Sequence, residues 1–106
     1  MDIYSLTEME TRELVSGATV AFVHSGSMTL AYWHFEPGVS VPEHAHPHEQ
    51  VVNVIEGSLE LTVDGNTARL GPGSVVVIPP DASHSGDSVT ACRIIDVFHP
   101  VREDYR

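Results

Sequence analysis

Short runs of β-forming residues, separated by glycine and proline at intervals of roughly ten residues, most constrain what this chain can fold into. Such spacing is typical of an antiparallel sandwich or a small barrel. The 106 residues provide enough chain for a single domain, residues 1–106. We therefore predict an all-β fold with strands at residues 19–24, 28–35, 50–56, 59–63, 67–70, 74–78 and 89–98. Asp64-Gly65 predicts a tight hairpin, because a type I′ turn needs positive φ at both central residues.

The two ends of the chain have weaker patterns. Residues 1–15 are expected to form an N-terminal arm, in which residues 3–15 make an edge strand with at most one helical turn. Thr7 to Glu10 resembles a helix capping box, but the apolar periodicity after it is too weak for a longer helix. Residues 99–106 are expected to form a C-terminal tail.

Two of the predicted strands are apolar on both faces, at residues 50–56 and 74–78. Both faces of such strands must be covered. One face is expected to line the interior, and the other to pack on a second layer or a partner subunit. Because the chain is too short to cover everything itself, we expect a homodimer.

Charge and composition restrict the partners. Fifteen acidic residues face five basic ones, all arginine, and the net charge is −10. This surface repels phosphate backbones and anionic lipid, so we expect neither a nucleic-acid nor a membrane partner. No apolar run has transmembrane length, and the first residues lack a secretory-signal pattern. The single cysteine, Cys92, fits a reducing compartment as a small buried side chain, and a cytoplasmic location is expected.

A histidine-rich segment predicts a metal site. His44 and His46 are two residues apart, so on an extended strand both side chains leave the same face. Gln50 has the same parity, and His84 lies downstream among turn residues. We predict that these four residues bind one divalent transition metal, and Ni, Zn, Fe, Mn and Co all accept such ligands. Three imidazoles and an amide leave the ion's charge uncompensated, which favours an anionic or carbonyl-bearing ligand.

Two neighbours compete for roles at this site. Glu49 replaces Gln50 as the ligand if the alternation of side chains slips at Pro47. His48 shares the parity of the ligands but falls in the turn, so it is expected at the rim.

Two motifs in this chain resemble the two signatures of the cupin superfamily. The motifs are Gly38-x5-His44-x-His46-x3-Gln50-x6-Gly57 and Gly73-x5-Pro79-x-Asp81-x2-His84-x3-Ser88. Gln50, Asp81 and Ser88 depart from the usual Glu, Gly and Asn. The resemblance implies a small antiparallel jelly-roll β-barrel with a divalent metal inside, held by the first-motif residues and by His84.

A narrower resemblance involves residues 46–50 (His-Pro-His-Glu-Gln) and the tail at residues 96–105. Both are similar to bacterial pectin-degradation cupins, which linearise unsaturated uronates such as 4,5-unsaturated galacturonate to open-chain keto sugar acids. The resemblance implies a metal-dependent isomerase. Two alternatives remain: a metal-dependent dioxygenase acting on a small organic substrate, and a non-catalytic cupin that binds a sugar acid.

Three residues near the C-terminus are candidates for the chemistry. Asp96 lies within an apolar strand, so it either pairs with an arginine or acts as a general acid/base. The resemblance implies a catalytic Asp96 with Phe98 lining the substrate pocket. Arg102 is the candidate for binding a substrate carboxylate through its planar guanidinium, with a role beside Asp96 in catalysis. Its alternative is an ion pair with Glu103, with Asp104 or with a partner subunit.

Overall fold

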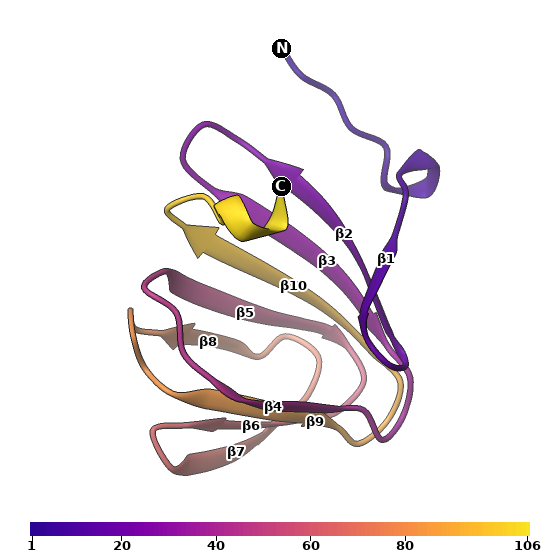
Figure 1. Cartoon of the computed structure of the whole chain (residues 1–106). Helices are drawn as coiled ribbons and strands as arrows, with labels where there is room; N and C mark the ends of the chain where they lie inside the picture. Colours follow the sequence, from indigo (N-terminus) through magenta and orange to yellow (C-terminus); the bar gives the residue numbers. More distant parts are fainter.

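Two antiparallel β-sheets face each other in the computed structural model, which describes all 106 residues (Figure 1). The larger sheet has the strand order β1-β2-β3-β10-β5-β8, and the smaller has the order β4-β9-β6-β7. The predicted all-β jelly roll is confirmed. The strands are β1 Arg12–Val15, β2 Ala18–His24, β3 Thr29–Phe35, β4 Ser40–His44, β5 Glu49–Glu56, β6 Leu59–Val63, β7 Asn66–Leu70, β8 Val75–Ile78, β9 His84–Ser88 and β10 Cys92–His99.

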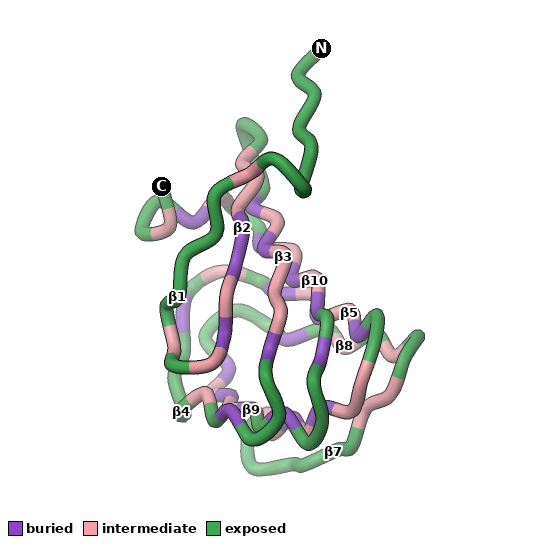
Figure 2. Tube along the Cα trace, turned by 90° about the vertical axis from the view of Figure 1, so that its right-hand side faces the viewer, coloured by how far each residue is buried: buried purple, intermediate pink, exposed green.

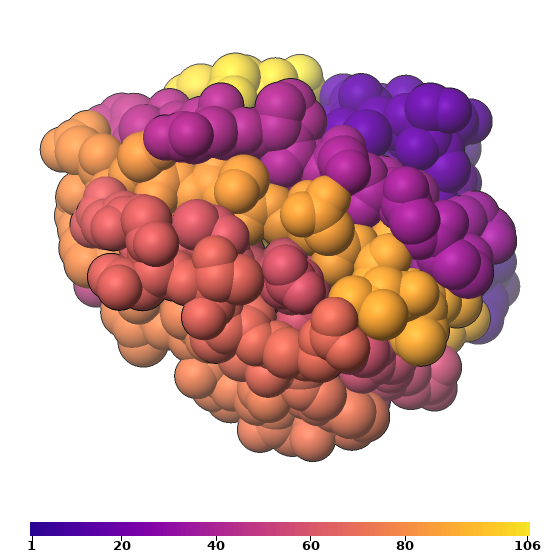
Figure 3. Space-filling view, turned by 90° about the horizontal axis from the view of Figure 1, so that it is seen from below, coloured from indigo at the N-terminus to yellow at the C-terminus, as the bar shows by residue number.

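The predicted hairpin joins β6 and β7. Asp64 and Gly65 have φ angles of 47° and 80°, and Val63 pairs with Asn66 across the turn. Gly tolerates positive φ without strain, and Asp does so more readily than most residues. This turn fixes the register of the smaller sheet, in which β9 lies between β4 and β6 (Figure 3).

Strands β4 and β9 were not among the predicted strands. They pair with each other and place His44 opposite His84. The sequence of β9 is His-Ser-Gly-Asp-Ser, which lacks the apolar alternation of a strand. Pairing with β6 holds it in the sheet instead. Strand β10 begins at Cys92, three residues later than predicted.

The N-terminal arm contains the edge strand β1, which pairs with β2, and one 3-10 turn, η1 (Leu6–Glu8). The single turn is present, and the edge strand is shorter than predicted, covering residues 12–15 rather than 3–15. The capping box is wrong, because Ser5 is the N-cap residue and makes no side-chain cap hydrogen bond. No helix has the length and apolarity needed to cross a membrane.

The core lies between the two sheets (Figure 2). Alternate residues of β5 and β10 point inward, among them Val52, Val54 and Ile94. The opposite face is not covered by this chain, since Val75 and Val77 of β8 remain 60% and 59% exposed. The expected second layer is therefore absent within one chain.

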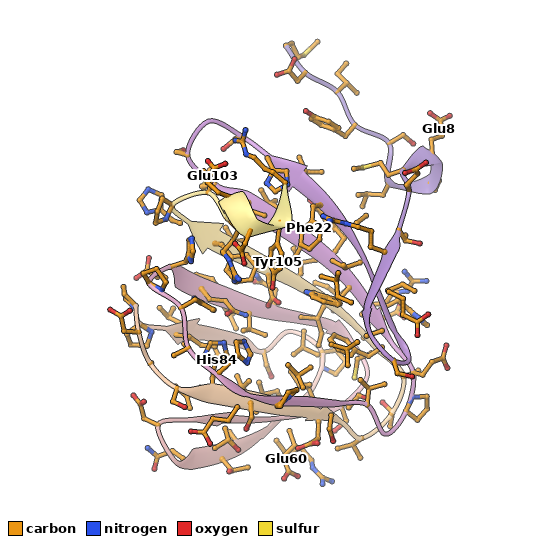
Figure 4. All side chains as sticks on the ribbon, viewed as in Figure 1. Glu8, Phe22, Glu60, His84, Glu103 and Tyr105 are labelled. Atoms are coloured by element: carbon orange, nitrogen blue, oxygen red, sulfur yellow. The ribbon has the colours of Figure 1, made fainter.

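The C-terminal tail packs beside the larger sheet and ends in the 3-10 turn η2 (Glu103–Tyr105). Arg12 donates a hydrogen bond of 2.5 Å to the Tyr105 carbonyl, and the Tyr105 ring stacks on Phe22 at 4.5 Å between centroids (Figure 4). These contacts position Arg102, the residue before η2.

Candidate metal centre and acid–base site

Three histidines meet between the two sheets. His44 is the last residue of β4, and His84 is its cross-strand partner at the start of β9. His46 follows β4 in the connection to β5. One ring nitrogen from each histidine lies within 4.8 Å of the others, and His84 points into the space between the sheets (Figure 4).

The predicted convergence of His44 and His46 is present, but its predicted cause is wrong. Strand β4 ends at His44, so the two rings do not share a face of one strand. His46 reaches the cluster from the bend at residues 45–48, and its backbone carbonyl accepts a hydrogen bond of 2.9 Å from the Asp81 amide. The second histidine therefore depends on a contact with the second motif.

Each of the three rings has its Nδ1 atom beside a backbone carbonyl. A carbonyl can only accept, so each Nδ1 carries the proton and each Nε2 keeps a free lone pair. The His84 Nε2 atom is buried and has no hydrogen-bond partner. Imidazoles oriented in this way are typical metal ligands, and the cluster fits a divalent ion. The pairs are His44 with Pro42 (2.8 Å), His46 with His48 (3.0 Å) and His84 with Ala82 (2.9 Å).

Gln50 lies at the cluster and Glu49 does not. Gln50 is buried in β5, and its Oε1 atom lies 3.0 Å from His46 Nε2. Glu49 is exposed on the other side of the strand, opposite His99. Between the two alternatives, the structure thus brings Gln50 to the three histidines.

Burial favours the neutral form of two of the three histidines, His46 and His84. The pKa of His46 is lowered, first by desolvation and then by the positive charge of Arg102. Desolvation also lowers the pKa of His84. Neutral imidazole is the form that binds metals. His48 lies next to this cluster, with its ring centroid 5.6 Å from that of His46, in the position expected for a rim residue.

Asp96 faces the same cavity from the middle of β10. It is 8% exposed, and its Oδ1 atom has no hydrogen-bond partner. Burial raises the pKa of Asp96 to about 7, against the opposing effects of hydrogen bonds from Gln50 and Trp33 and of the Arg102 charge. A carboxyl group with a pKa near neutrality can both donate and accept a proton.

Arg102 is buried at the cavity wall, and its guanidinium already forms an ion pair within the chain. Its Nε and Nη2 atoms donate hydrogen bonds of 2.9 and 2.7 Å to the Asp104 carboxylate. The guanidinium lies between two rings, 4.9 Å from the Phe98 centroid and 4.1 Å from that of Tyr105. The ion pair with Asp104, left open by the sequence, is present, while Glu103 pairs with Arg106 instead.

Most of the predicted site residues line one cavity of about 370 Å³, and His46 lies just outside its lining. Its polar end carries five predicted site residues, and its remaining walls are mostly apolar. Sequence reasoning missed Tyr105 and Trp33 as wall residues, because an aromatic residue in a strand or tail is usually core. The polar end is formed by His44, Gln50, His84, Asp96 and Arg102.

Comparisons with known proteins give a consistent family assignment. Residues 31–98 match the family described as "Cupin domain". "Polyketide synthase CurC" from Streptomyces cyaneus is 37% identical over 91 residues, which is 85% of this chain and 57% of CurC. The "HTH-type transcriptional regulator PuuR" of Escherichia coli (strain K12) is 29% identical over 79% of this chain and 49% of PuuR. The chain thus spans about half the length of these two relatives.

Solved structures with similar folds cover the whole chain. KdgF from Halomonas sp. superposes with a TM-score of 0.94 at 24% identity, over 100% of this chain and 99% of KdgF. An RmlC-like cupin from Shewanella frigidimarina also has a TM-score of 0.94, at 27% identity, over 100% of this chain and 96% of that one. The polyketide cyclase RemF from Streptomyces resistomycificus has a TM-score of 0.82 at 23% identity, over 93% and 79%.

Proposed function

This chain belongs to the cupin domain family, and we propose that it is a metal-dependent isomerase that converts a 4,5-unsaturated galacturonate-type uronate to its open-chain keto form. The observation that supports this most is the position of Asp96, a buried acid in the same cavity as the three-histidine cluster. The resemblance of residues 46–50 and 96–105 to pectin-degradation cupins also supports the proposal, and KdgF from Halomonas sp. has the same fold.

His44, His46, His84 and Gln50 would hold one divalent transition metal, whose identity the donor set leaves open among Ni, Zn, Fe, Mn and Co. When bound, such an ion supplies Lewis-acid polarisation of a ligand oxygen.

The reaction requires one proton to move within the substrate. The C1 hydroxyl loses a proton as the bond between C1 and the ring oxygen breaks, which leaves an aldehyde at C1 and an enolate at C5. A proton is then added to C4, and the enolate becomes a ketone. Atoms balance without an oxidant or a water molecule. Asp96 is the group in the cavity whose pKa, about 7, suits both accepting and donating this proton.

Arg102 and Phe98 would orient the substrate. Because Asp104 occupies the Nε–Nη2 edge of the guanidinium, only the remaining edge is available to a substrate carboxylate. A substrate carboxylate would therefore bind the edge of the guanidinium that Asp104 leaves free. Phe98 packs edge-on to the His46 ring, with centroids 5.6 Å apart, and would line the substrate pocket beside the metal ligands.

An ultraviolet assay tests this function directly. Metal-loaded protein should remove the absorbance of the conjugated double bond in 4,5-unsaturated galacturonate. Asp96→Asn should keep its metal but lose turnover. Glu49→Gln is the matched control, because this exposed carboxylate lies outside the cavity. A flat trace from fully metallated wild-type protein would contradict the proposal. Oxygen uptake by the iron-loaded protein would favour the dioxygenase alternative, and ligand binding without turnover would favour the non-catalytic one.

We also propose a cytoplasmic homodimer that takes a small anionic or carbonyl-bearing molecule and binds neither nucleic acid nor membrane. The exposed side chains of Ile55, Val75 and Val77 on the outer face of the larger sheet support a dimer contact there. The net charge of −10 argues against polyanionic partners.

A further inference from the structure

The cavity has an apolar end that the proposed proton transfer does not use. Beyond the polar end, its walls come from both sheets and contain no charged group. Most of these side chains are buried and belong to the hydrophobic core. They include Phe35, Val41, Leu59, Leu61 and Ile94.

A glycine keeps this end open. Gly86 is an inward-facing residue of β9, two residues after His84, and it pairs with Val41 on one side and Leu61 on the other. A Cβ atom at Gly86 would meet its nearest neighbours at 3.7–3.9 Å, which is ordinary contact. A side chain is thus sterically possible, yet none is present. Glycine inside a strand is unfavourable and often marks the close approach of a ligand.

Unfilled apolar surface of this kind is unfavourable for a small domain. Protein interiors are normally packed as densely as organic crystals, and the residues that line an open cavity lack part of those contacts. Water that enters from the mouth of the cavity finds few hydrogen-bond partners at these walls. The proposed uronate would occupy the polar end, because its hydroxyls would stay unpaired against these apolar walls. An apolar group would pack against these walls without leaving a polar atom unpaired.

We propose that the apolar end is a binding subsite for a hydrocarbon ring or chain attached to an oxygen-bearing head. This inference rests on the proposed function for the head, which the histidine cluster and Arg102 would hold. The ligand class is an amphipathic enol or keto acid, in addition to the uronate. A cavity of about 370 Å³ with a few polar groups at one end has the size and composition usual for such a ligand.

Two α-keto acids with the same head provide the first test. Pyruvate and phenylpyruvate are titrated calorimetrically into zinc-loaded protein. Phenylpyruvate should bind at least about tenfold more tightly than pyruvate, because burial of its ring against the apolar wall removes apolar surface from water. Gly86→Val, and Gly86→Ala to a smaller extent, should remove this advantage and leave pyruvate binding unchanged. Gly26→Val is the control, since nothing lies within 4 Å of a Cβ built at Gly26. Equal binding of the two acids by wild-type protein would overturn the proposal.

Benzene tests the apolar end without any head group. It should shift the methyl resonances of Val41, Leu61 and Ile94 in the wild-type protein and not in Gly86→Val. Absence of these shifts in the wild-type protein would overturn the subsite even if pyruvate binds. Conversely, a benzene signal in a protein that fails the ultraviolet assay would contradict only the uronate function.

Discussion

The Oε1 atom of Gln50 lies 3.0 Å from Nε2 of His46, and both are hydrogen-bond acceptors. The single proton of the neutral His46 ring is on Nδ1, where it is donated to the His48 carbonyl. Two acceptors at this distance repel each other unless a cation lies between them. The geometry therefore favours a shared metal over a hydrogen bond.

Removal of the Gln50 oxygen should weaken metal binding. Gln50→Leu keeps the approximate size of the side chain but has no donor atom, so zinc affinity should fall by about tenfold or more. Competition with a chromophoric chelator measures this change. Glu49→Gln should retain wild-type affinity, because Glu49 faces away from the cluster. Equal affinity in Gln50→Leu and wild-type protein would remove Gln50 from the ligand set.

Asp96 should make the stability of the metal-free protein decrease as the pH rises. Its pKa is about 7 when folded and 3.8 when exposed, so between these values the folded chain holds a proton that the unfolded chain has released. The favourable contribution is complete below pH 3.8 and is lost as the pH passes through about 7. Asp96→Asn does not ionise, so its stability relative to wild type should rise across this window, by about 2–4 kcal/mol at about pH 8.

Urea unfolding of both proteins in the presence of a chelator measures this difference. Stability curves that stay parallel from pH 4 to pH 8 would show that Asp96 has an ordinary pKa. The acid–base role would then lose its physical basis.

Asp104 should act as a positioning residue for Arg102. Its carboxylate accepts two hydrogen bonds from the guanidinium and fixes the edge that faces the cavity. Asp104→Ala should raise KM for the uronate about five- to tenfold, which corresponds to the loss of about 1 kcal/mol of binding, and change kcat less than about twofold. Asp104→Glu should restore part of the affinity. Glu103→Gln is the control, because the Glu103 carboxylate pairs only with Arg106.

Metal content should be the same in all of these variants. A fall in kcat of Asp104→Ala, with KM unchanged, would contradict a positioning role for Asp104. A KM that decreases would instead mean that Asp104 competes with the substrate carboxylate.

The outer face of the larger sheet should carry the dimer contact. Val77→Asp places a charge on an exposed apolar surface next to Val75 and should convert a dimer to a monomer. Light scattering after size-exclusion chromatography gives the mass. Thr67→Asp, on the exposed strand β7 of the other sheet, should stay dimeric. A monomeric wild-type protein, or a dimeric Val77→Asp, would contradict this contact.

The strands that the sequence predicted are those with apolar side chains at regular positions. Strands β5 and β8 have valine runs, and the Asp64-Gly65 turn defines β6 and β7. Among the residues that face the cavity, β4 has Val41 and His44 and β9 has His84 and Gly86, so neither strand shows a regular apolar alternation. The site residues in these two strands interrupt the apolar alternation on which strand prediction depends.

The site itself was predicted unevenly for similar reasons. Gln50 was distinguished from Glu49 by parity because β5 is continuous through both residues. The position of His46 depends on a bend and on the Asp81 amide, which parity does not describe. The Asp104 partner of Arg102 remained one of three alternatives, since both neighbouring acids and a partner subunit are within reach. The apolar end of the cavity was not predicted. It exists because Gly86 has no side chain, and a glycine in the sequence does not show whether the space beside it is filled.

Metal analysis by plasma mass spectrometry tests the central claim most directly. Wild-type protein reconstituted with zinc and desalted should contain about one metal per chain, and His84→Ala, which removes the buried and unpartnered Nε2 atom, should contain almost none. His99→Ala, at the exposed end of β10, should match the wild type. A wild-type protein that stays metal-free, or a His84→Ala variant that keeps its full metal content, would contradict the account.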